Sequence, residues 1–242
     1  MTLTLLTAPD AAAGIPLPYS PHADDTITLL LLGCFFLSSY ILARSRQLLA
    51  AQLKNFLLHR QRTSIFANYT GSDMRYLLLL IMQTCVLAAT CLFGYFVDTT
   101  PQLHDHISTP AFIALYTLIL GLYLSLKWLI YTAVGWIFLN KDTSAQWMES
   151  YSTLLHYLGF ALFPFALFML YCDLNLYATI IIGLFLVILF KILTFYKWLK
   201  LFCRNLAGCL LLILYFCALE IIPILLMYKG MLHLNYYLII NF

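Results

Sequence analysis

The stretch LYATIIIGLFLVILFKILTFYKW, residues 176–198, decides the fold class of this chain. A helix needs about 20 mostly apolar residues to cross the hydrocarbon core of a bilayer, and this stretch is long and apolar enough to do so. Similar runs recur along the chain, at 26–43, 76–97, 111–139, 154–171 and 206–228. We therefore predict an all-α fold, a polytopic transmembrane helix bundle of about six spans within residues 26–230.

The composition excludes a water-soluble domain of this size. Hydrophobic residues make up 63% of the 242 residues and charged residues only 10%, whereas soluble domains average about 45–50% and about 25%. A soluble fold would lack the polar side chains that must cover its surface. The net charge of +3 is too small to predict nucleic-acid binding, and no basic patch is interleaved with aromatic residues. The lipid bilayer is the expected partner.

The basic residues gather between alternate spans, which predicts an orientation. On one side lie Arg44, Arg46, Lys54, Arg60, Arg62, Arg75, Lys141, Lys197, Lys200 and Arg204; the other side has only Lys229. Because basic connections stay in the cytoplasm, six spans place both termini outside it. Residues 1–25 have no basic segment ahead of an apolar core, so we expect an irregular lead-in without a signal peptide. Residues 231–242 are apolar but too short to span, which predicts an interfacial tail or a segment packed on the bundle.

The cytoplasmic segment 44–62 is predicted to be a basic amphipathic helix. Leu49, Leu53, Phe56 and Leu57 repeat with the spacing of one helix face, and basic residues flank them. Such a helix could lie on anionic headgroups or dock a protein partner. A cytoplasmic extension of a neighbouring span explains the pattern equally well.

Glu220 is the most unusual residue in the sequence, because residues 210–226 around it are otherwise almost wholly apolar. A carboxylate at this depth costs at least a few kcal/mol, so it should face the bundle interior and have a partner. Lys127 lies at a similar depth, within roughly 7–8 Å along the membrane normal. Pro223 removes a helical hydrogen bond to the Leu219 carbonyl, which leaves an acceptor beside the acid. The sequence predicts a charge pair that either joins helices or takes part in transport.

Further polar residues are weaker candidates for a site. Lys191 is expected to anchor the membrane interface by snorkelling, and His156 to be a packing histidine more often than a ligand. Pro164 should kink its span. His104 and His106 could bind a metal loosely, but two histidines without a third fixed ligand are weak evidence. We predict no metal, no cofactor and no catalytic residues.

The motifs HExxH, GxSxG, GxxxxGK[ST] and GxGxxG are all missing from the sequence. Nothing therefore argues for an enzyme, although their absence leaves other chemistries open.

The C-terminal stretch LYFCALEIIP, residues 214–223, with the following pair Tyr228-Lys229, resembles the signature of a bacterial membrane family. That family is domain of unknown function 4271 of the Bacteroidota, which are Gram-negative. Residues 127–138 and 160–164 are similar to its middle, so the resemblance covers about residues 26–230. It implies a multi-pass inner-membrane protein with no assigned activity, so the termini that the basic residues place outside the cytoplasm would be periplasmic. It marks Glu220 and Pro223 as signature positions without giving them a role.

Three functions are compatible with these features. We favour a non-enzymatic accessory or assembly factor of an envelope process, with a partner at segment 44–62. A small proton- or ion-coupled transporter would use Glu220 and Lys127, and should show a cavity leading to them. A membrane enzyme acting on a lipid-linked substrate would use Glu220 or the His104/His106 loop. It should show a lateral cleft with at least two polar side chains.

Overall fold

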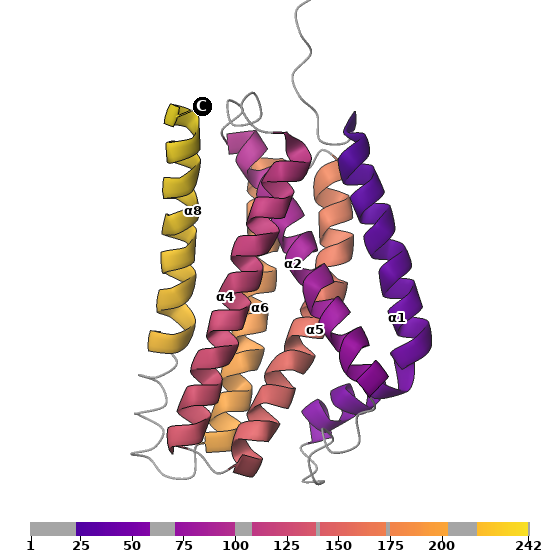
Figure 1. Cartoon of the computed structure of the whole chain (residues 1–242), viewed down its shortest axis with the longest axis vertical. Coiled ribbons are helices and arrows are strands. Elements are labelled where there is room, and N and C mark those ends of the chain that lie inside the picture. The colour runs from indigo at the N-terminus through magenta and orange to yellow at the C-terminus, as the bar shows by residue number, and fades with distance from the viewer. Residues whose placement is uncertain are drawn as a thin grey trace, which may run out of the picture.

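The computed structural model of the chain describes residues 23–58, 71–99, 108–138, 141–172, 175–202 and 217–241. Every secondary-structure element in these ranges is helical. The elements are α1 (Asp25–Leu58), α2 (Gly71–Thr99), α4 (Thr109–Phe138), α5 (Lys141–Tyr171), α6 (Leu176–Phe202), the π-helical turn η3 (Cys217–Ile221) and α8 (Ile222–Asn241). The helices run roughly along one axis as an elongated bundle (Figure 1). The predicted all-α class is confirmed.

Five of the described helices are long and apolar enough to cross a membrane: α1, α2, α4, α5 and α6. Their outward faces carry large apolar side chains in the open, among them Leu118 on α4 and Ile181 and Phe185 on α6. Such faces would be unfavourable in water and are favourable against lipid tails. The chain is a helical membrane protein.

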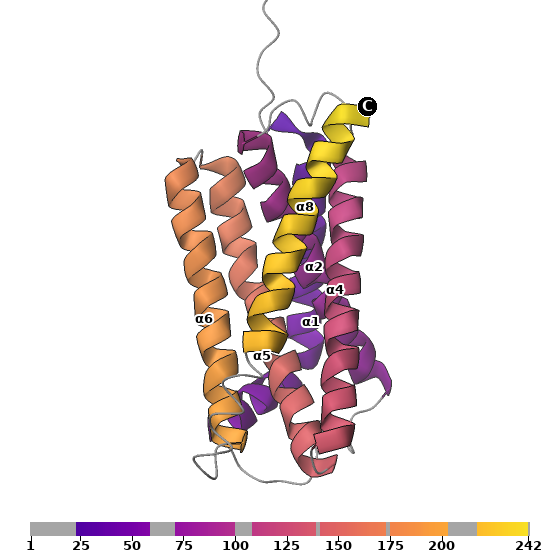
Figure 2. The same ribbon diagram turned by 90° about the vertical axis from the view of Figure 1, so that its left-hand side faces the viewer.

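The C-terminal end differs from the expected boundaries. The predicted sixth span was 206–228, followed by an interfacial tail at 231–242; residues 206–216 lie outside the described part of the chain. In the structure α8 continues without a break from Ile222 to Asn241. Met231 is buried in the main core, so the apolar residues after 228 extend the helix and pack on the bundle. Figure 2 shows α8 lying obliquely between α4 and α6, and ending at the same end of the bundle where α1 begins.

Helices α2 and α5 form the centre of the bundle, and the core lies between them and their neighbours. Aromatic rings fill the part of it near α4, where Phe112 and Tyr116 stack with ring centroids 4.4 Å apart. Two glycines let α2 and α5 approach closely. A Cβ on Gly94 would lie 2.7 Å from the end of the Met169 side chain. Gly159 directly faces Thr84.

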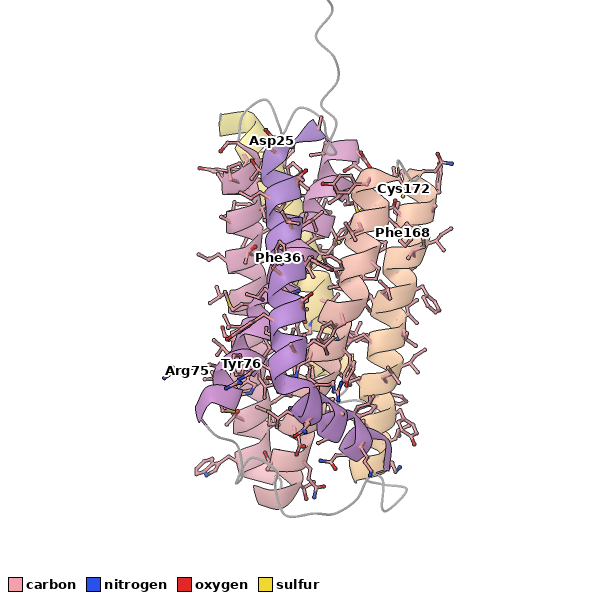
Figure 3. The ribbon with its side chains drawn as sticks, turned by 90° about the vertical axis from the view of Figure 1, so that its right-hand side faces the viewer. Asp25, Phe36, Arg75, Tyr76, Phe168 and Cys172 are labelled. Atoms are coloured by element: carbon pink, nitrogen blue, oxygen red, sulfur yellow. The ribbon has the colours of Figure 1, made fainter. Side chains whose placement is uncertain are left out.

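Helix α1 changes direction at Ser45, whose φ of −113° and ψ of 18° are not helical. Its first half follows the bundle, and its second half turns across the lower end, the end at which Arg75 lies (Figure 3). The segment after Ser45 is thus a helix joined to the first span through a kink, and its placement on headgroups or against a partner stays a prediction. The described part of the segment packs on the protein through Leu49 and Phe56, whereas Leu53 is exposed. The buried face is therefore rotated from the predicted one. Residues 59–62 lie outside the described residues.

Candidate functional site

Glu220 lies on the π-helical turn η3, immediately before α8. Pro223 follows three residues later; its ring removes one backbone donor and crowds the carbonyl of Leu219. A π turn is wider than an α-helical turn, and widening relieves that crowding. The local sequence thus accounts for the irregular backbone at the acid. The Glu220 side chain is fully buried.

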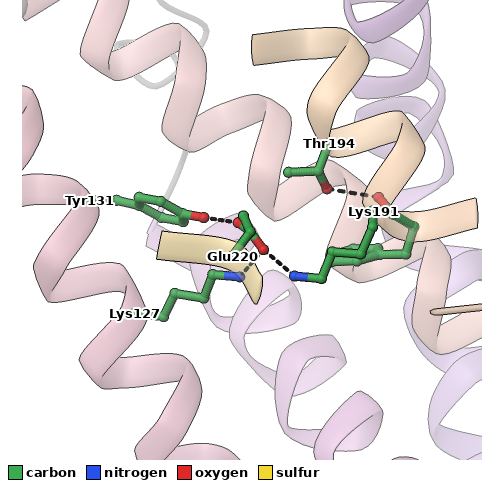
Figure 4. Close-up of polar contacts among 6 residues, drawn as sticks. Lys127, Tyr131, Lys191, Thr194 and Glu220 are labelled. Atoms are coloured by element: carbon green, nitrogen blue, oxygen red, sulfur yellow. Dashed lines mark hydrogen bonds and ion pairs between the residues drawn. The ribbon is translucent and has the colours of Figure 1, made fainter. Parts of the chain in front are cut away.

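Glu220 accepts hydrogen bonds from three side chains (Figure 4). The Lys127 Nζ atom donates to Oε2 over 2.5 Å. Lys191 Nζ donates to the same oxygen, and the Tyr131 hydroxyl donates to Oε1. We call these four residues the ion cluster. The two residues that the sequence paired, Glu220 and Lys127, are in direct contact, while their role stays a prediction.

Lys191 lies elsewhere than expected. The sequence predicted that it snorkels to the membrane interface, but its ammonium points inward to Glu220 (Figure 4). A buried carboxylate attracts any ammonium within reach more strongly than a headgroup region does, because the surroundings screen the charges poorly. The turn that carries Lys191 is regular; the Thr194 hydroxyl donates to the Phe190 carbonyl over 2.8 Å.

Aromatic rings enclose the lysine side of the ion cluster. The Lys127 Nζ atom lies 5.2 Å from the ring centroid of Tyr151 and 5.6 Å from that of Tyr131, within range of cation–π attraction. Trp147 meets Tyr131 edge to face at 5.4 Å. Tyr131 could have been found from the sequence, because it lies four residues after Lys127 and hence on the same helix face. Tyr151 could not, since it comes from α5.

The ion cluster holds more positive than negative charge. Two ammonium groups share one carboxylate, so the three groups sum to +1 when all are ionised. The neighbouring tyrosine rings add cation–π attraction to Lys127. Removing the carboxylate would leave two like charges close together, whereas removing one lysine would leave a neutral pair.

The ion cluster joins three elements: α4 through Lys127 and Tyr131, α6 through Lys191, and η3 through Glu220. A second contact fastens α8 nearer its end, where the Tyr116 hydroxyl of α4 donates to Asn235 Oδ1. The C-terminal helix is thus held to the bundle by polar contacts at two positions along its length. Breaking a buried ion pair by removing one partner typically costs about 3–5 kcal/mol.

A groove of about 430 Å³ lies beside the ion cluster, between α2, α4 and α5, with Gln52 of α1 at its edge. Tyr151 separates the two, because it lines the groove while its ring packs against Lys127. Neither Lys127, Lys191 nor Glu220 lines the groove. His156 does line it and is fully buried.

The other predicted positions are spread along the bundle. Pro164 lies inside α5, which continues through it, and Pro223 lies in the first turn of α8. The structure brings neither His156 nor Pro164 into contact with Glu220 through any hydrogen bond or ion pair in the described residues. His104 and His106 lie outside the described part of the chain.

The comparisons with known proteins identify a family and no function. Residues 27–231 match the model of a domain of unknown function (DUF4271), which covers most of the chain, so the chain belongs to that family. The resemblance noted in the sequence is thereby confirmed. Neither a curated protein nor a solved structure matches the chain.

Proposed function

We propose that this member of the DUF4271 family is a non-enzymatic accessory or assembly factor of the bacterial inner membrane, in which the ion cluster is a structural clamp. One observation carries the proposal: both oxygens of the buried Glu220 carboxylate are engaged by groups of its own chain. Both of its oxygens accept hydrogen bonds from Lys127, Lys191 or Tyr131. A catalytic or transporting carboxylate needs an oxygen that a substrate or ion can reach.

The clamp interpretation also accounts for the position of Glu220. The described contacts of η3 and α8 with the rest of the chain include the ion cluster, the Asn235 contact and the buried Met231. Ionic contacts inside a membrane are strong enough to fix one helix, because little solvent competes with them. We infer that Glu220 holds the C-terminal helix in one orientation, which an assembly factor needs in order to present a constant surface.

A partner would bind at the second half of α1. Arg44, Arg46 and Lys54 are exposed there, while Leu49 and Phe56 on the other side of the helix are buried against the bundle. The outward surface is therefore mainly basic, with Leu53 exposed among the charges, and complements an acidic protein surface. Acidic headgroups would meet the same charges, so the test must separate a protein from lipid.

The test is affinity capture of the tagged chain from native membranes after mild cross-linking. We expect one protein at constant stoichiometry, reduced several-fold by Arg46→Glu and unchanged by Lys229→Glu. Lys229 is an exposed lysine on α8, so the control makes a comparable change of charge outside the basic segment. Recovery of the chain with lipid alone, from wild type and both variants, would contradict the accessory role.

A second candidate, a small proton- or ion-coupled transporter, is favoured by the π turn under Glu220. Irregular backbone beside an intramembrane acid is typical of ion pathways. The lateral groove, however, does not include Glu220 among its lining residues. Ion flux into liposomes containing the purified chain, abolished by Glu220→Gln with the protein still folded, would establish the transporter instead. An enzyme that uses Glu220 on a lipid-linked substrate would need the acid in that groove.

A further inference from the structure

The groove between α2, α4 and α5 opens sideways, toward the lipid. Its rim is formed by exposed side chains of the outer helix faces, Met74, Leu78 and Met82 of α2 and Trp128 of α4. Its floor is formed by buried residues of α5, Tyr151 and His156 among them. A molecule dissolved in the bilayer could therefore enter without passing through water.

The floor contains a histidine whose hydrogen-bonding groups are not all satisfied. His156 is fully buried, and neither Nδ1 nor Nε2 makes a hydrogen bond of ordinary geometry among the described residues. The Leu77 backbone forms a hydrogen bond of poor geometry with the ring, which leaves at least one of the two nitrogens without a partner among the described residues. Buried polar groups in folded proteins are almost always paired. An imidazole that lines a groove is a natural place for a bound molecule to supply the missing bond.

The lining also defines the charge of the molecule. It contains no Asp, Glu, Lys or Arg, and its polar side chains are neutral ones such as Ser152 and Gln52. A phosphate headgroup would find no positive charge here, because Lys127 lies behind Tyr151. The groove fits a neutral head that offers hydrogen-bond acceptors or donors, joined to an apolar tail that continues into the lipid.

The walls favour a flat, polarisable head. Three methionines, Met74, Met82 and Met148, surround it together with Cys85 and the indole of Trp128. Sulfur atoms and indoles make favourable contacts with ring faces and edges. The volume of about 430 Å³ is in the range of ligand pockets and holds a bicyclic ring with the start of a tail.

We propose that this groove binds an isoprenoid quinone, with the ring against the methionines and Trp128 and one ring oxygen hydrogen-bonded to His156. In one tautomer the ring nitrogen that faces the quinone carries the proton and donates to the carbonyl of the oxidised form; in the other tautomer the same nitrogen accepts from the hydroxyl of the reduced form. The site thus serves both forms, and no electron transfer by the chain is required.

Binding is tested with the full chain in lipid nanodiscs, titrated with a naphthoquinone that carries two isoprene units. Quinones quench tryptophan fluorescence at short range, and Trp128 reports occupancy from the rim of the groove. His156→Phe keeps an aromatic ring but removes the hydrogen bond. We expect it to weaken binding about 3- to 10-fold, the loss of one hydrogen bond.

Two glycines give a matched control. A Cβ added at Gly121 or at Gly33 would meet no atom within 4 Å, so neither substitution creates a clash at its Cβ. Gly121 lines the groove, whereas Gly33 lies on α1 away from it. Gly121→Leu should weaken binding at least 10-fold and Gly33→Leu less than 2-fold. Equal quenching in both variants would show mere partitioning into the bilayer and overturn the proposal.

Competing ligands test whether the groove recognises the quinone ring. An isoprenoid alcohol with the same tail and an anionic phospholipid should each displace the quinone only at 10-fold or higher excess. Displacement by either at equal concentration would show that the groove takes a tail or a headgroup instead, and would overturn the assignment. If Gly121→Leu lowers the melting temperature of the protein, the binding experiment is repeated with Ser125→Leu. Ser125 is an exposed residue that also lines the groove.

Discussion

Replacing Glu220 by Gln should destabilise the protein far more than replacing Lys127 by Met. The reason is the two-to-one stoichiometry of the ion cluster, in which Lys127 and Lys191 both donate to Glu220. The Glu220→Gln variant would leave two buried ammonium groups without a counter-charge. Losing the partner of one buried charge costs about 3–5 kcal/mol, and the repulsion between the two ammonium groups adds to this.

The Lys127→Met variant retains a neutral pair, because Lys191 and the Tyr131 hydroxyl still donate to Glu220. It loses one charged hydrogen bond and the cation–π contacts, but it also removes an excess buried charge. The two effects oppose each other, so we expect a net loss below about 2 kcal/mol.

The same reasoning predicts the combined variants. Glu220→Gln with Lys127→Met still leaves Lys191 unpaired and should recover only part of the stability. Adding Lys191→Met removes the last buried charge and should recover most of it, because a buried ion network replaced by apolar side chains is often neutral in stability.

The assay is reversible unfolding of the purified chain in mixed micelles with increasing denaturing detergent, followed by tryptophan fluorescence. Trp147 and Trp198 pack at 4.9 Å near the ion cluster and should report its loss. Equal destabilisation by Glu220→Gln and Lys127→Met, or no recovery in the triple variant, would refute the two-to-one arrangement.

Two further predictions concern helix packing. Gly159→Ala should destabilise the protein by about 1–3 kcal/mol, because its Cβ would overlap Thr84 Oγ1 and lie 3.3 Å from the Thr84 Cβ. Gly33→Ala, with open space around the Cβ, should lie within about 0.5 kcal/mol of wild type in the same assay. Tyr116→Phe should cost about 1 kcal/mol and make α8 more accessible to protease near its end, because it removes the hydrogen bond to Asn235; unchanged proteolysis would show that this contact does not hold α8.

The helices were predictable because lipid imposes a simple rule: every spanning segment must be long, apolar and helical. Glu220 and Lys127 could be matched from depth alone, since an intramembrane acid needs a partner and few ionisable groups lie at its level. The sequence could not show how α6 rotates about its axis, and this rotation determines whether Lys191 faces lipid or Glu220. For residues 231–242 the sequence left open an interfacial tail or a segment packed on the bundle, because they are too few to span alone; in the structure α8 continues to Asn241 and buries Met231.

The groove could not be predicted from the sequence. His156 belongs to α5, and the methionines beside it belong to α2 and α5. Each is an ordinary residue of an apolar helix, and only the packing angle between helices leaves a space among them. Pairing within one helix, such as Lys127 with Tyr131, follows from spacing, whereas a surface shared by three helices does not.

The structural role of Glu220 is tested most directly in cells, by measuring membrane protein level and envelope integrity for Glu220→Gln and for the triple variant with Lys127→Met and Lys191→Met. A structural clamp predicts that Glu220→Gln lowers the protein level and impairs the envelope, and that the triple variant restores both. A normal level of Glu220→Gln with lost function, unrestored in the triple variant, would contradict this account and assign Glu220 to transport or chemistry.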